Sequence, residues 1–179
     1  MKPAPKIPSP SGGRSGWGWV NGNFQWWLAL SAVILVVDQL TKFAITRNFL
    51  LHESVPVTSF FNLVLVYNPG AAFSFLADAT GWQNGLFIGI GMIASAWIVW
   101  LLHKQPQQTL FCAALSLVLA GALGNLIDRV QFGAVIDFLD FHAAGWHWPA
   151  FNVADSAISC GAALLVWEAL TAKRKPATA

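Results

Sequence analysis

The chain has 179 residues, the length of a single domain, but its composition is not that of a water-soluble one. Hydrophobic residues make up 56% and charged residues 10% of the chain, against roughly a quarter charged in a typical soluble domain. These values argue against a soluble globule or an intrinsically disordered chain. The formal net charge of +2 is too small for a nucleic-acid-binding surface. The composition is that of an integral membrane protein.

Four apolar segments are long enough to cross a bilayer as helices, which takes about 20 residues each. They cover residues 26–45, 84–102, 110–128 and 151–170. The first is longer than a signal-peptide core, and no small-x-small cleavage site follows it, so a retained helix is expected. The sequence predicts one four-helix transmembrane domain over residues 26–170. We expect a disordered Pro-, Gly- and Ser-rich extension over residues 1–25 and a basic tail over residues 171–179.

Basic residues are unevenly distributed between the two sides of these spans. Most lie on the side that carries both termini: Lys2, Lys6, Arg14, Lys104, Lys173, Arg174 and Lys175. Arg47 and Arg129 lie on the other side, and Lys42 lies near that end of the first span. Because basic residues concentrate on the cytoplasmic side, both termini are expected in the cytoplasm and the two long connections outside.

The first outer connection contains a predicted strand. Residues 60–67, FFNLVLVY, are rich in aromatic and β-branched side chains, which is typical of strands. The segment runs into the turn signal Asn68-Pro69-Gly70, and residues 71–76 are expected to return as a second strand. These features predict a small amphipathic sheet resting on the outer membrane surface.

Acidic residues converge on one level of the predicted bundle. Asp38 and Asp155 lie inside the first and fourth spans, and an ionisable group costs about 2.5–3.5 kcal/mol at the centre of a span. Asp128 and Arg129 lie at the outer end of the third span, and Asp137 follows in the next connection. At a rise of about 1.5 Å per residue, all of them lie near the outer face. Two carboxyl groups held together share a proton and can hydrolyse a peptide bond by acid–base catalysis.

Helical spacing brings some of these residues together. Gly121, Asn125 and Asp128 share one face of the third span, and Asn152 and Asp155 share a face of the fourth. With Gly124, Gly121 also allows a neighbouring helix to approach closely. No His-Glu-x-x-His motif is present and the histidines are scattered, so no metal site is expected. Cys112 and Cys160 lie mid-span and are expected to be small buried apolar residues.

Most of the acids also have a structural interpretation. Asp38 and Lys42, four residues apart, can form an ion pair. Asp128 beside Arg129 can form a charge pair that caps the third helix, and Asp140 can be a solvated loop acid. Asp155 has no cation within helical reach, which favours a functional role for it.

Five short motifs follow one another along this topology: DQLTK at 38–42, NPGAAF at 68–73, GALGNLIDR at 121–129, VIDF at 135–138 and FNVADS at 151–156. With these motifs in this order, residues 26–170 resemble the lipoprotein signal peptidases of bacteria, also called signal peptidase II. The resemblance implies an α-helical integral membrane protein with four transmembrane helices, a small extracytoplasmic β-cradle and a periplasmic helix or loop. It also implies an aspartic endopeptidase of the bacterial inner membrane, with its site near the periplasmic face. Such enzymes remove the signal peptide of a diacylglyceryl-modified prolipoprotein by cutting before the lipidated lipobox cysteine.

The resemblance also assigns residues. It implies a catalytic pair of Asp137 and Asp155, although helical spacing alone ranks Asp128 above Asp137, and Asp140 is a competitor if the loop shifts register. It implies substrate-binding or supporting roles for Asn68, Gly121, Asn125, Asp128, Arg129, Asn152, Asp38 and Lys42. No metal or other cofactor is implied. The expected partners are prolipoprotein substrates, membrane lipid and the inhibitor globomycin, with the enzyme acting as a monomer and binding no nucleic acid.

Two other functions fit a four-helix membrane protein with acids at one level. One is a proton-coupled transporter subunit, although transporters usually bind their substrates near the bilayer midplane. The other is a non-catalytic membrane scaffold, for which an unpaired Asp155 is an unexplained energetic cost.

Overall fold

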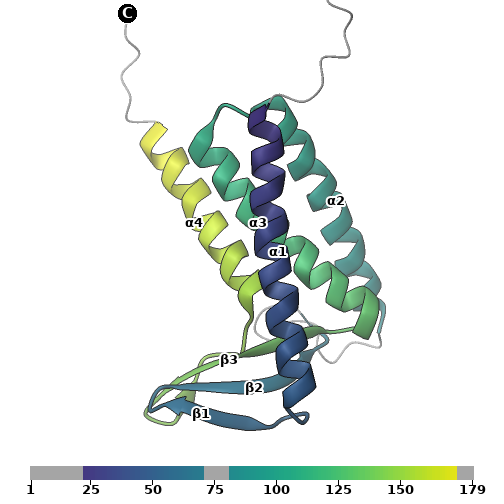
Figure 1. Ribbon diagram of the computed structural model, residues 1–179, viewed down its shortest axis with the longest axis vertical. Coiled ribbons are helices and arrows are strands. Elements are labelled where there is room, and N and C mark those ends of the chain that lie inside the picture. The colour runs from purple at the N-terminus through teal and green to yellow at the C-terminus, as the bar shows by residue number, and fades with distance from the viewer. Residues whose placement is uncertain (1–21, 71–80, 173–179) are drawn as a thin grey trace, which may run out of the picture.

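A computed structural model describes residues 22–70 and 81–172 of the chain. The helices are α1 (Gly22–Asn48), α2 (Trp82–Lys104), α3 (Thr109–Phe132) and α4 (Val153–Ala172). The strands are β1 (Ser54–Thr58), β2 (Phe61–Asn68), β3 (Val135–Ala143) and β4 (Trp146–His147). Figure 1 shows the helices as an elongated bundle with the sheet across one end.

All four helices are long and apolar enough to cross a membrane, which confirms the predicted fold class. Large apolar side chains on their outer surface are exposed, including Val33, Ile93 and Trp167. Such a surface suits lipid, and a helix satisfies its own backbone hydrogen bonds there. Helix α1 begins at Gly22 rather than near residue 26, while residues 1–21 and 173–179 lie outside the described residues.

Helix α3 packs against each of the other three helices. Small residues allow this close packing on the side of α4, where a Cβ on Gly161 would lie only 2.7 Å from the carbonyl oxygen of Ala114. The interior between α2 and α3 is apolar and includes Ile98, Leu102 and Leu119. Cys112 is buried there as expected, but Cys160 is exposed on α4, contrary to the prediction, because it lies on the side of α4 turned away from the bundle.

The sheet is antiparallel, with strand order β1-β2-β3-β4. Strand β2 confirms the strand predicted at residues 60–67. The returning strand predicted at 71–76 lies outside the described residues, as does part of any periplasmic helix or loop. Strands β1, β3 and β4 were not predicted, and β3 carries Asp137 opposite Val66 of β2.

The sheet is joined to the bundle by an apolar contact. Ile45 near the end of α1 packs with Leu65 of β2 and with Ile136 and Phe138 of β3. The start of α1, the connection between α2 and α3, and the end of α4 lie at the opposite end of the bundle (Figure 1). The polar residues of α1, α3 and α4 therefore meet β3 at the sheet end.

Candidate active site

Asp137 and Asp155 reach the sheet end of the bundle from different elements. Asp137 lies near the start of β3, and Asp155 lies in the first turn of α4. Asn152 precedes that helix, and its Oδ1 accepts the backbone N–H of Asp155 at 2.8 Å, as an N-cap residue does. The cap fixes the first turn of α4 and with it the position of Asp155.

Three asparagine amides donate to the two carboxyl groups. Asn152 Nδ2 lies 2.8 Å from Oδ1 of Asp137, and Asn68 Nδ2 lies 3.1 Å from Oδ2 of the same residue. Asn125 Nδ2 lies 2.8 Å from Oδ1 of Asp155. Asn152 Nδ2 also lies 3.3 Å from Oδ1 of Asn125, so one continuous network links both aspartates.

Burial and charge disfavour full ionisation of this pair. Asp137 is 2% exposed, and its burial together with the nearby charge of Asp155 raises the pKa of Asp137 to about 7. The hydrogen bonds from Asn68 and Asn152 and the charge of Lys42 oppose this rise only in part. The pair therefore retains one proton near neutral pH, as two close carboxyl groups do.

A buried cluster of charged residues lies beside this network and supports it. Lys42 Nζ lies 2.9 Å from Oδ2 of Asp38 and 2.7 Å from Oδ2 of Asp128. The Asp38–Lys42 pair is confirmed, but the expected pairing of Asp128 with Arg129 is wrong, because Asp128 faces α1 rather than its neighbour. Gln39 Nε2 donates to both acids at 3.1 Å.

The acids of this cluster also hold backbone at the site. Asp38 Oδ1 accepts the N–H of Ala154 in the first turn of α4 at 2.8 Å, and Asp128 Oδ2 accepts the N–H of Ile136 in β3 at 3.2 Å. The helix that carries Asp155 and the strand that carries Asp137 are thereby fixed to one charge cluster.

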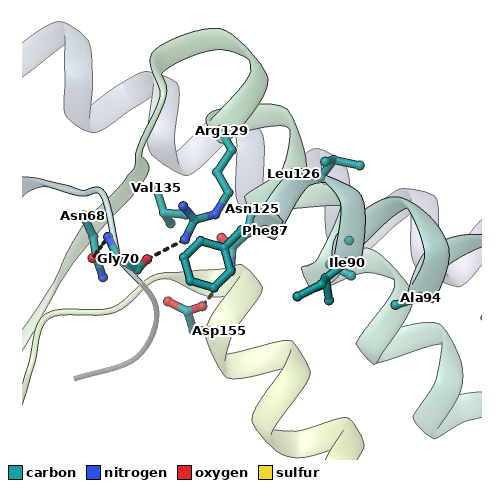
Figure 2. Close-up of a pocket in the computed structure, with 12 residues that line it drawn as sticks. Asn68, Gly70, Phe87, Ile90, Ala94, Asn125, Leu126, Arg129, Val135 and Asp155 are labelled. Carbon is teal, nitrogen blue, oxygen red and sulfur yellow. Dashed lines mark hydrogen bonds between the residues drawn. The ribbon is translucent and has the colours of Figure 1, made fainter. Parts of the chain in front are cut away.

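Arg129 has a different neighbourhood. Its guanidinium donates to the carbonyl oxygens of Pro69 at 3.4 Å and Gly70 at 2.5 Å, and lies 4.5 Å from the ring centre of Phe87. The two hydrogen bonds hold the turn that follows Asn68, and Figure 2 shows the one to Gly70.

Asp140 belongs to a separate network on the sheet. It is 7% exposed, with Asn62 Nδ2 at 2.8 Å and His147 Nδ1 at 2.8 Å, so the interpretation as a solvated loop acid is wrong. Burial opposes its ionisation, but the hydrogen bonds from His147 and Asn62 outweigh it and lower the pKa of Asp140. The structure brings Asp137, rather than Asp140, into the asparagine network with Asp155.

The two predicted glycines let α1 and α4 approach α3 at this level. A Cβ on Gly121 would overlap the backbone carbonyl oxygen of Ala154, and one on Gly124 would lie 2.5 Å from Oδ2 of Asp38. Any larger residue would therefore push apart the helices that position the site.

A cavity of about 260 Å³ opens beside Asp155. Its polar end is formed by Asn68, Asn125, Arg129 and Asp155. Apolar side chains of α2 and α3 line the rest, and they include Phe87, Ile90, Ala94 and Leu126 (Figure 2). One cavity thus joins a carboxyl group to an apolar wall.

Gln39 and Phe87 are among the residues of the site that were not predicted. Gln39 follows Asp38 in the DQLTK motif, and a polar amide inside an apolar span was the signal available. Phe87 has no sequence signal, because an aromatic residue in an apolar span is ordinary. Within residues 22–70 and 81–172, no three His, Cys, Asp or Glu side chains lie close enough to hold a metal ion.

Residues 30–171 match the protein family described as Signal peptidase (SPase) II. The lipoprotein signal peptidase of Cupriavidus pinatubonensis is 58% identical over 149 residues, which cover 83% of this chain and 85% of that protein. The lipoprotein signal peptidase of Ralstonia nicotianae is 54% identical over 165 residues, covering 92% and 94%. A solved bacterial membrane enzyme, determined by the in meso method at 2.3 Å resolution, is similar with a TM-score of 0.76 and 31% identity, covering 87% of this chain and 94% of that one.

Proposed function

The chain belongs to the signal peptidase II family, and from that premise we propose how its site cuts the peptide bond and where it acts. It is a membrane peptidase that removes signal peptides from prolipoproteins. The transporter and scaffold alternatives are not favoured.

We propose that Asp137 and Asp155 are the catalytic pair of an aspartic, metal-independent mechanism. One observation carries this proposal: the two carboxyl groups share one asparagine network, and Asp155 lines the polar end of the cavity. One ionised carboxylate activates water, and the protonated partner stabilises the oxygen of the tetrahedral intermediate. Asn68, Asn125 and Asn152 orient the pair, while Asp38, Lys42, Asp128, Gly121 and Arg129 hold the elements that carry it.

The shape of the cavity supports a lipid-modified substrate. A diacylglyceryl-cysteine combines a peptide backbone with acyl chains, and the cavity has a polar end and an apolar wall. Burial of acyl chains is worth about 0.8 kcal/mol per methylene group, which favours lipidated over unmodified precursors. In this proposal the acyl chains lie along α2 and α3, and the bond before the modified cysteine lies at the polar end.

The same proposal places the chain in the bacterial inner membrane with both termini in the cytoplasm. The positive-inside bias of the sequence supports this orientation, since seven of the ten basic residues, Lys104 among them, lie on the side of the spans that carries both termini. The site then lies near the periplasmic face. One chain is enough to complete the hydrogen-bond network of the site, so we propose that the enzyme acts as a monomer, and globomycin is expected to inhibit it.

The test is cleavage of a diacylglyceryl-modified prolipoprotein by the purified chain in lipid, with and without EDTA. The control substrate carries serine in place of the lipobox cysteine and cannot be lipidated. Mass spectrometry should find a cut before the modified cysteine, unaffected by EDTA, and none in the control. Equal cleavage of the control would overturn lipid recognition, and inhibition by EDTA would overturn metal independence.

A further inference from the structure

The hydrogen-bond donors around the catalytic pair distinguish the two aspartates from each other. We infer that the shared proton resides on Oδ2 of Asp155, and that Asp137 is the ionised member which activates water. This inference rests on the proposed function and adds the separate roles of acid and base. It follows from the direction in which three asparagine amides point.

The direction of the Asn152 amide is fixed at both ends. Its Oδ1 accepts a backbone N–H, that of Asp155 at 2.8 Å, and a backbone N–H can only donate. Its Nδ2 lies 3.1 Å from the carbonyl oxygen of Ile136, which can only accept. The same Nδ2 therefore presents an N–H to Oδ1 of Asp137.

The other two amides are fixed in the same way. Lys42 Nζ lies 3.2 Å from Oδ1 of Asn125, and a lysine ammonium can only donate, so Asn125 Nδ2 faces Oδ1 of Asp155. The backbone N–H of Gly70 lies 3.0 Å from Oδ1 of Asn68, so Asn68 Nδ2 faces Oδ2 of Asp137.

These directions favour one of the four carboxyl oxygens as the place for the proton. Both oxygens of Asp137 and Oδ1 of Asp155 each face an amide N–H, and a proton on any of them would leave that donor with a hydroxyl oxygen, a weaker acceptor than a carboxylate or carbonyl oxygen. Within residues 22–70 and 81–172, Oδ2 of Asp155 receives no hydrogen bond. Since Asp155 also lines the cavity, a proton on this oxygen is available to a substrate carbonyl.

The reaction then balances with one proton on the pair. Asp137 takes a proton from water as the water oxygen bonds to the scissile carbonyl carbon, and Asp155 Oδ2 gives its proton to the carbonyl oxygen. Asp137 next protonates the amide nitrogen of the lipidated cysteine as the carbon–nitrogen bond breaks. Asp155 recovers a proton from one hydroxyl of the intermediate as the carboxylic acid forms. Protonated Asp137 faces two donors, which favours its release of the proton to the leaving nitrogen.

Asparagine substitutions test this assignment because an amide mimics a protonated carboxyl group. In Asp155→Asn, Oδ1 still accepts from Asn125, and the NH₂ group takes the place of the protonated oxygen. In Asp137→Asn, the NH₂ group must face the donor of Asn152 or of Asn68. We expect Asp155→Asn to melt at or above the wild-type temperature, and Asp137→Asn to melt roughly 3–10 °C lower.

A double variant that exchanges the carboxylate of position 137 with the amide of position 68 gives the matched control. In the double variant Asp137→Asn/Asn68→Asp, the carboxylate at position 68 accepts from both Gly70 and the new amide. We expect the double variant to recover most of the lost melting temperature, although Asn68→Asp alone lowers it by placing two carboxylates together. If the two substitutions only damaged the fold, the double variant would instead melt below both single variants.

Cleavage measured on the same preparations distinguishes the identity of the catalytic pair from the position of its proton. We expect the wild type to cut and both single asparagine variants to be inactive. If both are inactive but Asp155→Asn is the less stable, or the swap recovers nothing, the proton assignment is overturned and the catalytic pair stands. If Asp137→Asn still cuts, the catalytic pair itself is wrong, and the assignment of Asp137 as base falls with it.

Discussion

Lys42 Nζ on α1 lies 2.7 Å from Oδ2 of Asp128 on α3, and both side chains are almost completely buried. A third buried charge, Asp38, lies 2.9 Å from the same nitrogen. Because Asp38 and Asp128 hold α4 and β3 through backbone N–H groups, this cluster connects the stability of the bundle to the position of the catalytic pair.

Lys42→Met should therefore destabilise the protein strongly. It leaves two buried carboxylates without their cation, a change that typically costs about 3–5 kcal/mol. Thermal or denaturant unfolding in detergent measures the loss. Lys104→Met is the control, since Lys104 is exposed at the other end of the bundle and should change little. Equal stability of the two variants would show that the cluster does not support the fold.

Gly121→Ala should also destabilise the protein, through packing rather than charge. Its Cβ would overlap the backbone carbonyl oxygen of Ala154, and such overpacking typically costs about 1–3 kcal/mol. Gly89→Ala on α2 is the matched control, because nothing lies within 4 Å of its Cβ position. The melting temperature should fall for Gly121→Ala alone. A similar change in both variants would contradict the close approach of α3 and α4.

Filling the cavity should impair substrate binding while the fold persists. Gly91 lines the cavity, and its Cβ position is in ordinary contact with Leu126 at 3.6 Å, so a leucine here projects toward the acyl-chain wall. We expect Gly91→Leu to lower kcat/KM by at least about tenfold, which corresponds to about 1.4 kcal/mol. Gly89→Leu, two residues away on the same helix and outside the cavity lining, should retain full activity. Equal rates for the two variants would place the acyl chains elsewhere.

The raised pKa of Asp137 has a consequence for stability. Because burial and the nearby charge of Asp155 raise this pKa from 3.8 to about 7, the catalytic pair of the folded state holds its one shared proton more tightly than the separate carboxyl groups of the unfolded chain do. The resulting stabilisation is complete below about pH 4 and is lost as the pH rises to about 7. The melting temperature of Asp137→Ala should therefore fall less than that of the wild type between these values.

Asp140 changes stability with pH in the opposite direction. Its pKa is lowered by His147 and Asn62 against the effect of burial, so its contribution is present above its ordinary pKa and is lost as the pH falls. Asp140→Ala should therefore reduce the loss of stability in acid and leave the fall toward pH 7 in place. The same pH profile for both alanine variants would contradict the two different environments.

The sequence predicted the membrane spans well because each span is long and uniformly apolar, so that length alone identifies it. It predicted β2 because the strand is a run of aromatic and β-branched residues. It did not predict β3, since Asp137 and Asp140 interrupt the apolar pattern and their polar partners come from distant parts of the chain. Which acids pair is likewise a property of the fold: Asp128 lies beside Arg129 in the sequence, yet it contacts Lys42 on another helix.

Some polar residues of the site could also be predicted from local sequence patterns, and others could not. Helical spacing grouped Gly121, Asn125 and Asp128 on one face, and the structure places all three toward α1 or α4. No local pattern indicated that Asn68, at the end of β2, donates to Asp137 in β3, because that contact depends on strand register. The expectation that Asn68 and Asp137 belong to the site came from the resemblance to a family and not from helical periodicity.

The catalytic pair is tested most directly by the rate at which purified variants cleave a diacylglyceryl-modified prolipoprotein. Asp137→Asn and Asp155→Asn should each lose at least about 10²–10⁴-fold in kcat, the usual contribution of a general acid or base. Asp140→Asn, three residues from Asp137 on the same strand, should retain most of the wild-type rate. Cleavage by Asp137→Asn at the wild-type rate, or loss of activity in Asp140→Asn with the fold intact, would contradict the account.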